Sequence, residues 1–290
     1  MERISVGGLE LSRIAYGTMR LFDLDDQGEA AIRTRLEAAL AVGMTTIDTA
    51  DIYGGYTVEE RLGAVFKADP AFAAQFEIVT KCGIQAPWGE RKALPVKHYD
   101  TSRDYIHAQV ERSLDKLGVE AIDLLLIHRP DPFMDADATG RALDELVASG
   151  KVKAVGVSNF RPWDVSLLQS RMGTPLLANQ IELSLGHTTP FTNGDLAFAY
   201  EHDVRIMAWS PLGGGSVLAH PTLVAMAQEK GSTPGQIALA FLLAHPSGIQ
   251  PVIGTNRPER IEEAAGALGI ELSRTEWFQL LEAVRGEPVA

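Results

Sequence analysis

Four residues of the sequence have side chains that together could protonate a carbonyl oxygen, and they are Asp48, Tyr53, Lys81 and His128. Tyrosine is a weak acid with an ordinary pKa of about 10, and a lysine cation beside it lowers that pKa by favouring the phenolate. An aspartate paired with the lysine keeps the lysine charged, and a neutral histidine can hydrogen-bond a substrate oxygen. These residue types therefore predict a proton-donating site.

The segments around these residues alternate short apolar, β-branched runs with longer stretches of helical period, a pattern typical of repeated βα units. The predicted strands are Ile14–Tyr16, Thr45–Ile47, Phe76–Thr80, Ile122–Ile127, Val152–Val157, Leu177–Ile181, Arg205–Ala208 and Gln250–Ile253. The predicted helices are Ala30–Ala41, Val58–Phe66, Thr101–Leu117, Ala138–Ser149, Pro162–Arg171, Asn193–His202, Pro234–Ala244, Pro258–Leu268 and Arg274–Val284, with a capping box around Thr101.

Eight strands and their helices favour an α/β fold, a closed (β/α)8 TIM barrel that occupies residues 1–290 as a single domain. Two alternating runs around Gly7-Gly8, namely Arg3–Val6 and Leu9–Ser12, predict an N-terminal β-hairpin. A doubly wound open sheet is the alternative, but no G-x-G-x-x-G follows the first barrel strand.

The predicted barrel would bring the chemically capable residues to one rim, because the carboxyl ends of its parallel strands meet there. Each residue alone has an ordinary structural explanation: a turn cap for Asp48, a solvated charge for Lys81, a backbone-bonded histidine for His128. Functional side chains at seven consecutive strand ends are harder to explain in that way. We therefore expect an active site at this rim.

Composition narrows the class of protein. The chain has 290 residues, 46% of them hydrophobic and 22% charged, as in ordinary globular proteins. A net charge of −12 argues against nucleic acid as a partner. No apolar run is long enough to cross a membrane, no secretory signal follows Met1, and Cys82 is the only cysteine, so we expect a cytoplasmic protein. Its histidines show no metal-ligand spacing, so no metal is expected. The oligomeric state is not predicted.

Several motifs resemble those of the aldo-keto reductase family. Asp48-x4-Tyr53, Lys81 and His128 resemble its Asp-Tyr-Lys-His tetrad. Further matches, which extend the resemblance over almost the whole chain, are Gly17-Thr18-Met19, Gly156–Phe160, Asn179–Glu182, Trp209–Gly213 and Val252–Glu263. Within the family, the sequence is most similar to the bacterial general oxidoreductases of the YdhF group. The resemblance implies NADPH-dependent reduction of a small aldehyde or ketone to an alcohol.

The resemblance also implies a role for each matched residue. Tyr53 would be the general acid, assisted by Lys81 and Asp48, and His128 would position the carbonyl. The residues implied to bind the cofactor are Gly17, Thr18, Met19, Ser158, Asn159, Gln180, Trp209, Ser210, Leu212, Gly213, Gly254, Thr255, Asn256 and Arg260. Of these, the polar residues of the fifth and sixth strands would hydrogen-bond the nicotinamide carboxamide, and Trp209 would stack on the ring.

At the adenosine end the sequence departs from the family pattern. Many NADPH-preferring relatives have a lysine where Gly254 stands and an asparagine where Ala264 stands. Arg260 remains at the position of the family arginine that faces the 2′-phosphate, and an arginine fork suits phosphate geometry. We therefore expect NADPH to be preferred, with NADH accepted less well. The long loop Cys82–Asp100 is expected to place Trp88 in the substrate pocket.

Two other functions fit part of the sequence. Lys81 at a strand end could form a Schiff base, as in an aldolase, although this leaves the cofactor motifs unexplained. Some relatives are regulatory subunits that bind NADPH and sense redox state with little turnover. A catalytic role for Cys82 is not expected, because alternate residues of a strand face opposite sides and Lys81 faces the site.

Overall fold

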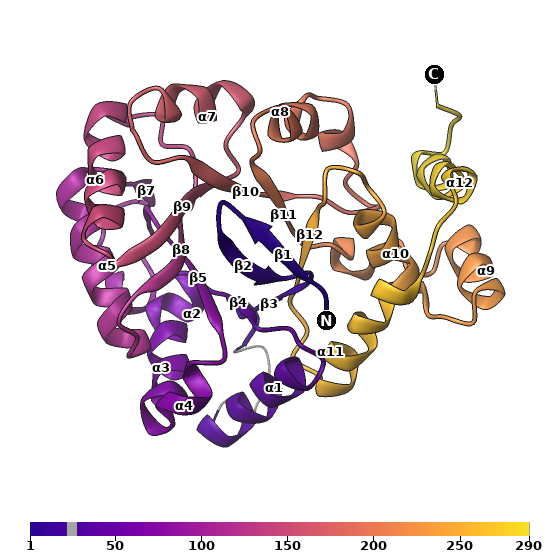
Figure 1. Ribbon diagram of the computed structural model, residues 1–290, viewed down its shortest axis with the longest axis horizontal. Helices are drawn as coiled ribbons and strands as arrows, with labels where there is room; N and C mark the ends of the chain where they lie inside the picture. Colours follow the sequence, from indigo (N-terminus) through magenta and orange to yellow (C-terminus); the bar gives the residue numbers. More distant parts are fainter. Residues whose placement is uncertain (22–27, 290) are drawn as a thin grey trace.

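The computed structural model describes residues 1–21 and 28–289, and its centre is a closed barrel of parallel strands (Figure 1). The barrel strands are β3 (Ala15–Gly17), β4 (Thr46–Asp48), β5 (Glu77–Cys82), β8 (Ile122–Ile127), β9 (Val152–Ser158), β10 (Leu176–Glu182), β11 (Arg205–Trp209) and β12 (Gln250–Ile253). Each strand pairs with the next along the chain, and β12 pairs with β3 to close the ring. The predicted barrel is confirmed, and each predicted strand overlaps an observed one.

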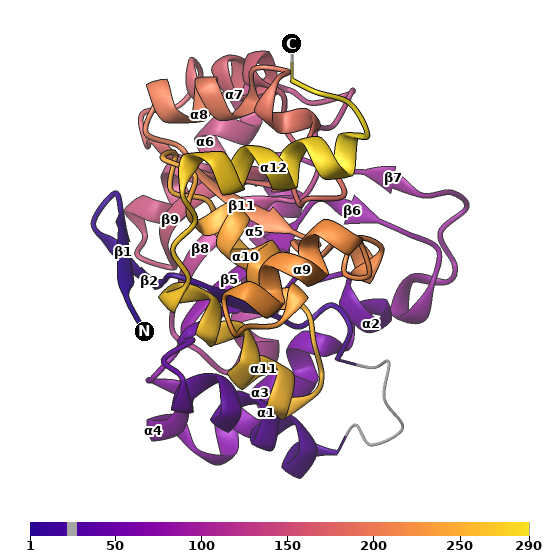
Figure 2. The same cartoon turned by 90° about the vertical axis from the view of Figure 1, so that its right-hand side faces the viewer.

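Helices surround this barrel (Figures 1 and 2). They are α1 (Glu29–Ala41), α2 (Tyr53–Tyr56), α3 (Val58–Ala68), α4 (Pro70–Ala73), α5 (Arg103–Leu117), α6 (Ala136–Ala148), α7 (Pro162–Gln169), α8 (Asp195–Glu201), α9 (Pro221–Glu229), α10 (Pro234–Leu243), α11 (Pro258–Ala265) and α12 (Arg274–Arg285). Every predicted helix overlaps one of these, whereas α2, α4 and α9 were not among those predicted.

The start of α5 differs from the prediction. Ser102, not Thr101, is the N-cap, and its hydroxyl oxygen accepts the backbone N–H of Tyr105 at 3.4 Å. The Thr101 hydroxyl instead donates to the carboxylate of Asp131 at 2.8 Å. A charged acceptor outside the helix therefore takes the hydroxyl that was expected to cap it.

Alternating side chains of the strands build two apolar layers. Leu124 and Leu126 of β8 point into the barrel and pack with Val79 and Met207. The residues between and after them point outward and pack against the surrounding helices. This alternation places every second strand residue in the barrel interior. Whether the last side chain of a strand points inward or outward therefore follows from its place in the alternation.

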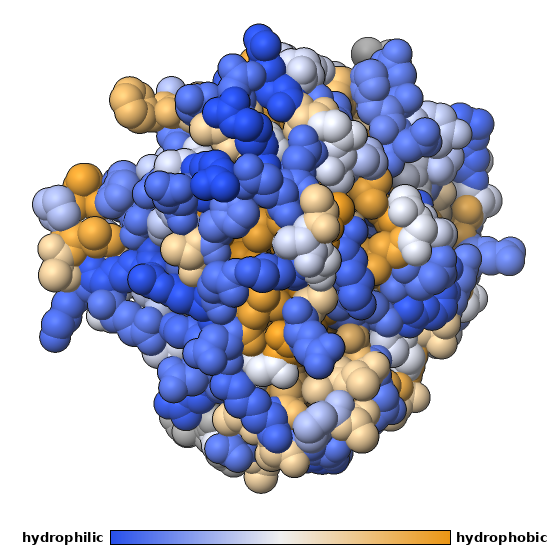
Figure 3. All heavy atoms as spheres, turned by 60° about the vertical axis from the view of Figure 1, so that its left-hand side comes forward, coloured by the Kyte–Doolittle hydropathy of each residue, from blue (hydrophilic) through white to orange (hydrophobic). Residues whose placement is uncertain are grey.

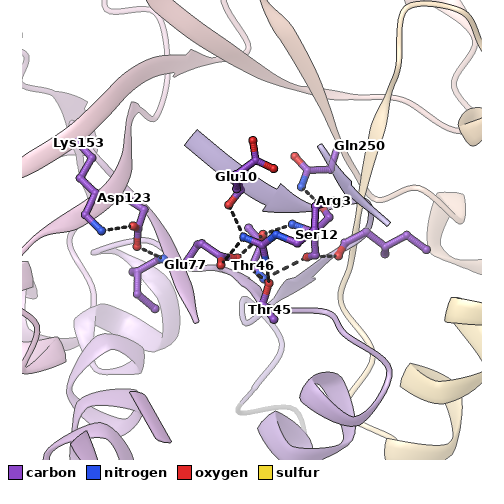
Figure 4. A network of polar contacts seen from close by, with 11 residues as sticks. Arg3, Glu10, Ser12, Thr45, Thr46, Glu77, Asp123, Lys153 and Gln250 are labelled. Carbon is purple, nitrogen blue, oxygen red and sulfur yellow. Dashed lines mark hydrogen bonds and ion pairs between the residues drawn. The ribbon is translucent and has the colours of Figure 1, made fainter. Parts of the chain in front are cut away.

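The amino end of the barrel is covered by the predicted hairpin of β1 (Arg3–Val6) and β2 (Leu9–Ser12). Figure 4 shows how polar contacts attach it there. The Arg3 guanidinium donates to Thr45 and to Glu77, at 2.7 Å each. Ser12 exchanges hydrogen bonds with Thr46 at 2.8 and 3.1 Å. These partners lie at or just before the starts of β4 and β5, so the hairpin occupies the end away from the predicted active rim.

The opposite end carries a two-stranded ribbon, β6 (Ile84–Gln85) and β7 (His98–Tyr99), built from the long loop after β5. Figure 2 shows this ribbon and the hairpin on opposite sides of the barrel. On the face shown in Figure 3, hydrophilic residues cover most of the surface, and hydrophobic ones lie in a central recess and in smaller groups toward the edges. No helix in the described ranges combines the length and apolarity that crossing a membrane requires.

Candidate active site

A cavity of about 650 Å³ lies where the barrel strands end at their carboxyl side. Its walls come from the ends of β3, β4, β8, β9, β10, β11 and β12 and from α10 and α11. This is the rim of a (β/α)8 barrel at which ligands bind. The sequence-predicted residues Asp48, Tyr53 and His128 line it, with Lys81 buried directly beneath.

The four predicted catalytic residues form one compact group. The Lys81 ammonium donates to Asp48 Oδ2 at 2.8 Å, to the backbone carbonyl of Thr49 at 2.8 Å and to the Tyr53 hydroxyl at 3.1 Å. The rings of Tyr53 and His128 meet edge to face with centroids 5.9 Å apart. The topology thus brings side chains from β4, α2, β5 and the end of β8 to one point.

A left-handed turn sets the position of Tyr53. Tyr53 begins α2, and the next three residues, Gly54, Gly55 and Tyr56, have φ values of 58°, 67° and 76°. Two glycines in succession make such a turn accessible, since they lack the Cβ that disfavours positive φ. The Tyr56 hydroxyl accepts the backbone N–H of Ala86 at 2.8 Å. The loop after β5 therefore anchors the end of the turn at Tyr56.

Burial and charge fix the protonation states of the site. Burial alone would lower the pKa of the Lys81 ammonium, but Asp48 and Tyr53 outweigh it and raise that pKa above its ordinary value. Burial raises the pKa of the Tyr53 phenol, and Lys81 opposes this only in part. The lowering of the tyrosine pKa expected from the sequence was thus wrong in net direction. Burial, with Lys81 and Arg129, lowers the pKa of His128 well below its ordinary value, so the ring is neutral at pH 7.

A chain of hydrogen bonds connects the cofactor motifs to this group. The Trp209 indole N–H donates to Asn159 Oδ1 at 3.0 Å, and Asn159 Nδ2 donates to Ser158 Oγ at 2.8 Å. The Ser158 hydroxyl donates to the backbone carbonyl of Gln180 at 2.8 Å, and Gln180 Nε2 donates to Asp48 Oδ1 at 2.6 Å. The amide groups of Asn159 and Gln180 are therefore held in fixed orientation, and each keeps further hydrogen-bonding capacity toward the cavity.

Most residues predicted to bind the cofactor line the cavity, namely Gly17, Met19, Ser158, Asn159, Gln180, Trp209, Ser210, Leu212, Gly254, Thr255, Asn256 and Arg260. Thr18 does not, because it is fully buried and its hydroxyl donates to the backbone carbonyl of Asp48 at 3.0 Å. Gly213 also lies outside the lining, whereas the next two glycines, Gly214 and Gly215, are part of it.

Trp88 lies outside the wall of this cavity. Its side chain is 52% exposed, and it immediately precedes a 3-10 turn, η1 (Gly89–Arg91), that packs against α2. Gly89 approaches Gly55 so closely that an added Cβ would lie 2.1 Å from the Gly55 carbonyl oxygen. This packing directs the loop along the outside of the turn that carries Tyr53.

The chemistry of the lining fits a nicotinamide dinucleotide. Amide side chains at the ends of β9 and β10 match the carboxamide. Gly214 and Gly254, where an added Cβ would meet no atom within 4 Å, leave open backbone for a pyrophosphate. Arg257 and Arg260, at the start of α11, add two guanidinium groups to the lining, and a guanidinium suits a phosphate.

Several lining residues were not expected to bind the cofactor. Arg20, Arg129, Gln236, Leu239 and Glu263 all face the cavity. Gln236 and Leu239 lie one turn apart on α10, and Arg129 directly follows His128, so helical spacing and adjacency to a predicted residue were the available signals. The same signals were available for Arg20, which directly follows Met19, and for Glu263, which lies one turn after Arg260 on α11.

Comparisons with known proteins show which family the chain matches. The sequence model of the Aldo/keto reductase family matches residues 13–285. A 6-dehydroglucose reductase from Agrobacterium fabrum is 54% identical over the full length of both chains. The oxidoreductase YdhF of Escherichia coli is 38% identical, covering 100% of this chain and 99% of its own. The crystal structure of a thermostable aldo-keto reductase in complex with the inhibitor epalrestat superposes with a TM-score of 0.83 at 29% identity, covering 98% of this chain and 100% of its own.

Proposed function

The chain belongs to the aldo-keto reductase family, and from that membership we propose that it reduces an aldehyde or ketone with NADPH, using Tyr53 as the general acid. Membership makes the protein an NAD(P)H-dependent oxidoreductase that acts on small-molecule carbonyl compounds. The observation that carries the finer proposal is the contact between the Tyr53 hydroxyl and the Lys81 ammonium, 3.1 Å apart, at the cavity lined by His128.

The chemistry divides between the cofactor and the chain. When bound, NADPH supplies the hydride that reduces the carbonyl carbon. Tyr53 donates its phenolic proton to the carbonyl oxygen, which completes the alcohol, and the Lys81 cation stabilises the phenolate that remains. Asp48 keeps Lys81 charged. His128 is neutral, and its Nδ1 is buried without a partner in the described residues, so its other nitrogen is the one available to the carbonyl oxygen.

The charged side chains at the end of the cavity formed by α11 support a moderate preference for NADPH over NADH. Arg257 and Arg260 attract a 2′-phosphate, whereas the carboxylate of Glu263 lines the same end and repels it. The Glu263 carboxylate also accepts a hydrogen bond from Thr233. A carboxylate near a ribose suits the free hydroxyl of NADH, so we propose that NADH is accepted less well but measurably.

The same contacts argue against covalent catalysis by lysine. Lys81 is fully buried and donates three hydrogen bonds, which is the full capacity of an ammonium. A Schiff base would require this nitrogen to lose its proton and reach the substrate, and neither its raised pKa nor its burial favours that.

The proposal is tested by cofactor binding and turnover. Titrating the protein with NADPH and NADH, followed by tryptophan fluorescence, should show tighter binding of NADPH. Adding 6-dehydroglucose, the substrate that names the Agrobacterium relative, and simpler aldehydes should then oxidise NADPH. Binding without oxidation by any carbonyl would favour an NADPH-binding regulatory subunit, and binding of neither nucleotide would contradict the proposal.

Arg260→Ala should weaken NADPH binding by about tenfold or more, as expected for a lost charge-assisted contact, and should weaken NADH binding little. Arg141→Ala, which removes an exposed arginine of α6, is the matched control and should change neither affinity. An equal loss for both nucleotides in Arg260→Ala would place the 2′-phosphate elsewhere.

A further inference from the structure

A second cavity, of about 440 Å³, lies beside the candidate active site at the same rim. Arg129, Asn159 and Trp209 line both cavities. Because the Trp209 indole N–H is bound to Asn159 at 3.0 Å, the shared wall is held in place. The second cavity therefore adjoins the cavity that Tyr53 and His128 line.

Three side chains of the second cavity have no polar partner within the described ranges. They are Arg129, Glu182 and His187, and none of them forms a side-chain hydrogen bond or ion pair there, although the Arg129 guanidinium lies over the Trp209 ring, 5.9 Å from its centroid. Glu182 ends β10 and lies opposite Trp209 in the strand register. His187 is fixed by a two-way backbone bridge to Ser184, at 3.1 and 3.2 Å. Each is partly buried, so a ligand that meets its polar atoms gains contacts that the protein itself does not provide.

Three other charged or amide side chains of this cavity, Arg161, Asn193 and Asp195, already have protein partners. Arg161 pairs with Asp164 through two contacts, at 2.7 and 3.0 Å. Asn193 Nδ2 donates to Asp195 at 2.8 Å. Besides the Asn159 amide, which both cavities share, the groups left for a ligand are therefore the Arg129 guanidinium, the Glu182 carboxylate and the His187 imidazole.

This combination selects for hydroxyl groups. A guanidinium only donates hydrogen bonds and a carboxylate only accepts them, while an imidazole does both according to its tautomer. An anionic ligand would be repelled by Glu182, and a cationic one by Arg129. A hydroxyl group both donates and accepts, and the apolar side chains of Ile181 and Pro190 suit the C–H faces between successive hydroxyls.

We propose that the second cavity is a substrate subsite that binds the hydroxyl groups of a neutral polyhydroxylated aldehyde, with Arg129, Glu182 and His187 as specificity-determining residues. This inference rests on the proposed carbonyl reduction. It goes beyond that function by assigning a class of substrate and the side chains that select it.

The test compares three four-carbon aldehydes: D-erythrose, which is polyhydroxylated, butanal, which is apolar, and succinic semialdehyde, which is anionic. With NADPH, kcat/KM for D-erythrose should exceed that for each of the others by about tenfold or more, because a site built to hydrogen-bond hydroxyls rejects analogues that lack them. Glu182→Leu and His187→Phe should each lower the ratio of D-erythrose to butanal by about tenfold. Glu201→Leu, which removes an exposed carboxylate of α8, should leave the ratio unchanged.

The possible outcomes distinguish failure of the subsite from failure of the proposed carbonyl reduction. Equal use of D-erythrose and butanal, or a parallel loss of both in Glu182→Leu, would overturn the subsite while leaving carbonyl reduction intact. Succinic semialdehyde as the preferred substrate would also overturn it, since the cavity would then be an anion site. Failure to reduce any of the three would count against the proposed function and the subsite together. Should Glu182→Leu not fold, as judged by NADPH binding, His187→Phe carries the same test.

Discussion

Lys81 is the residue on which the others of the site depend. Its side chain is fully buried, and its three donors reach Asp48, the backbone of Thr49 and Tyr53. A buried cation is stable only when paired and hydrogen-bonded, and here Asp48 supplies the charge while Gln180 supports Asp48 from the other side at 2.6 Å. The phenol of Tyr53 therefore always faces a positive charge that can stabilise its anion.

The pH dependence of reduction follows from these surroundings. The pKa of Tyr53 is raised, so the phenol keeps its proton at every pH below its ordinary value of about 10. The pKa of His128 is lowered well below its ordinary value, so the ring is neutral above that lowered pKa. We expect kcat/KM for reduction to change less than about twofold between pH 6.5 and 9, since neither group titrates there.

Alcohol oxidation by the same enzyme should behave differently, because it needs the Tyr53 phenolate. Its kcat/KM should rise about tenfold per pH unit over the same range. Initial rates in both directions, taken in buffers of constant ionic strength, measure the two profiles. A titration with a midpoint near pH 6.5 in the reductive direction would mean that His128 is charged in the working enzyme.

At the scale of elements, α2 and the loop after β5 act together to position Tyr53. The Lys116 ammonium of α5 donates to the backbone carbonyl of Tyr56 at 2.6 Å and pairs with Glu90 of η1 at 2.9 Å. Gly89, with φ of +51°, packs its backbone directly on Gly55. The loop thus serves as a support for the turn that carries the general acid.

Gly89→Ala tests this support, because its Cβ would lie 2.1 Å from the Gly55 carbonyl oxygen and displace α2. We expect kcat to fall by up to about 100-fold, as a displacement of about 1 Å at a catalytic group can cost that much. Gly150→Ala is the matched control, since Gly150 has φ of +76° but no atom within 4 Å of an added Cβ. Both variants should lose about 1 kcal/mol of stability from backbone strain. A normal kcat in Gly89→Ala would show that the loop does not position Tyr53.

The pattern of apolar residues made the barrel strands predictable. The loops and shorter helices that connect them were less predictable. Period-two and helical patterns located every barrel strand and the larger helices, because burial imposes those patterns. Helix α9 was missed, although Pro221 at its first position and the apolar Leu223 and Met226 were signals. The proximity of Asp48, Lys81 and His128 could be predicted because strand ends project to a common rim, whereas Tyr53 begins α2 and was added through the family resemblance. Glu182 ends a strand as well, but its partner His187 lies in a loop whose shape no local pattern encodes.

At the scale of the whole molecule, the hairpin that covers the barrel and the candidate site lie at opposite ends. The hairpin and its contacts to Thr45, Thr46 and Glu77 lie at the amino end, and the candidate site lies at the carboxyl end. Changes at the hairpin should therefore alter stability without altering the reaction.

Leu11→Ala tests this separation, because Leu11 of β2 is fully buried and its truncation leaves a cavity. We expect the free energy of unfolding to fall by about 2–5 kcal/mol, measured by urea denaturation. The kcat of the folded variant at 25 °C should remain within about twofold of the parent value, as the site is not touched. Ser5→Ala, at an exposed position of the same hairpin, should change stability by less than about 0.5 kcal/mol. A large drop in kcat in folded Leu11→Ala would show that the two ends are coupled.

The measurement that tests the central claim most directly is single-turnover reduction by Tyr53→Phe. The variant is mixed with NADPH and an aldehyde that the parent reduces, and loss of the nicotinamide absorbance is followed. The ring and its packing remain while the proton donor is removed, so hydride transfer should slow by about 100- to 10,000-fold with NADPH affinity nearly unchanged. Hydride transfer at the parent rate would contradict the account, because the proton would then come from another group.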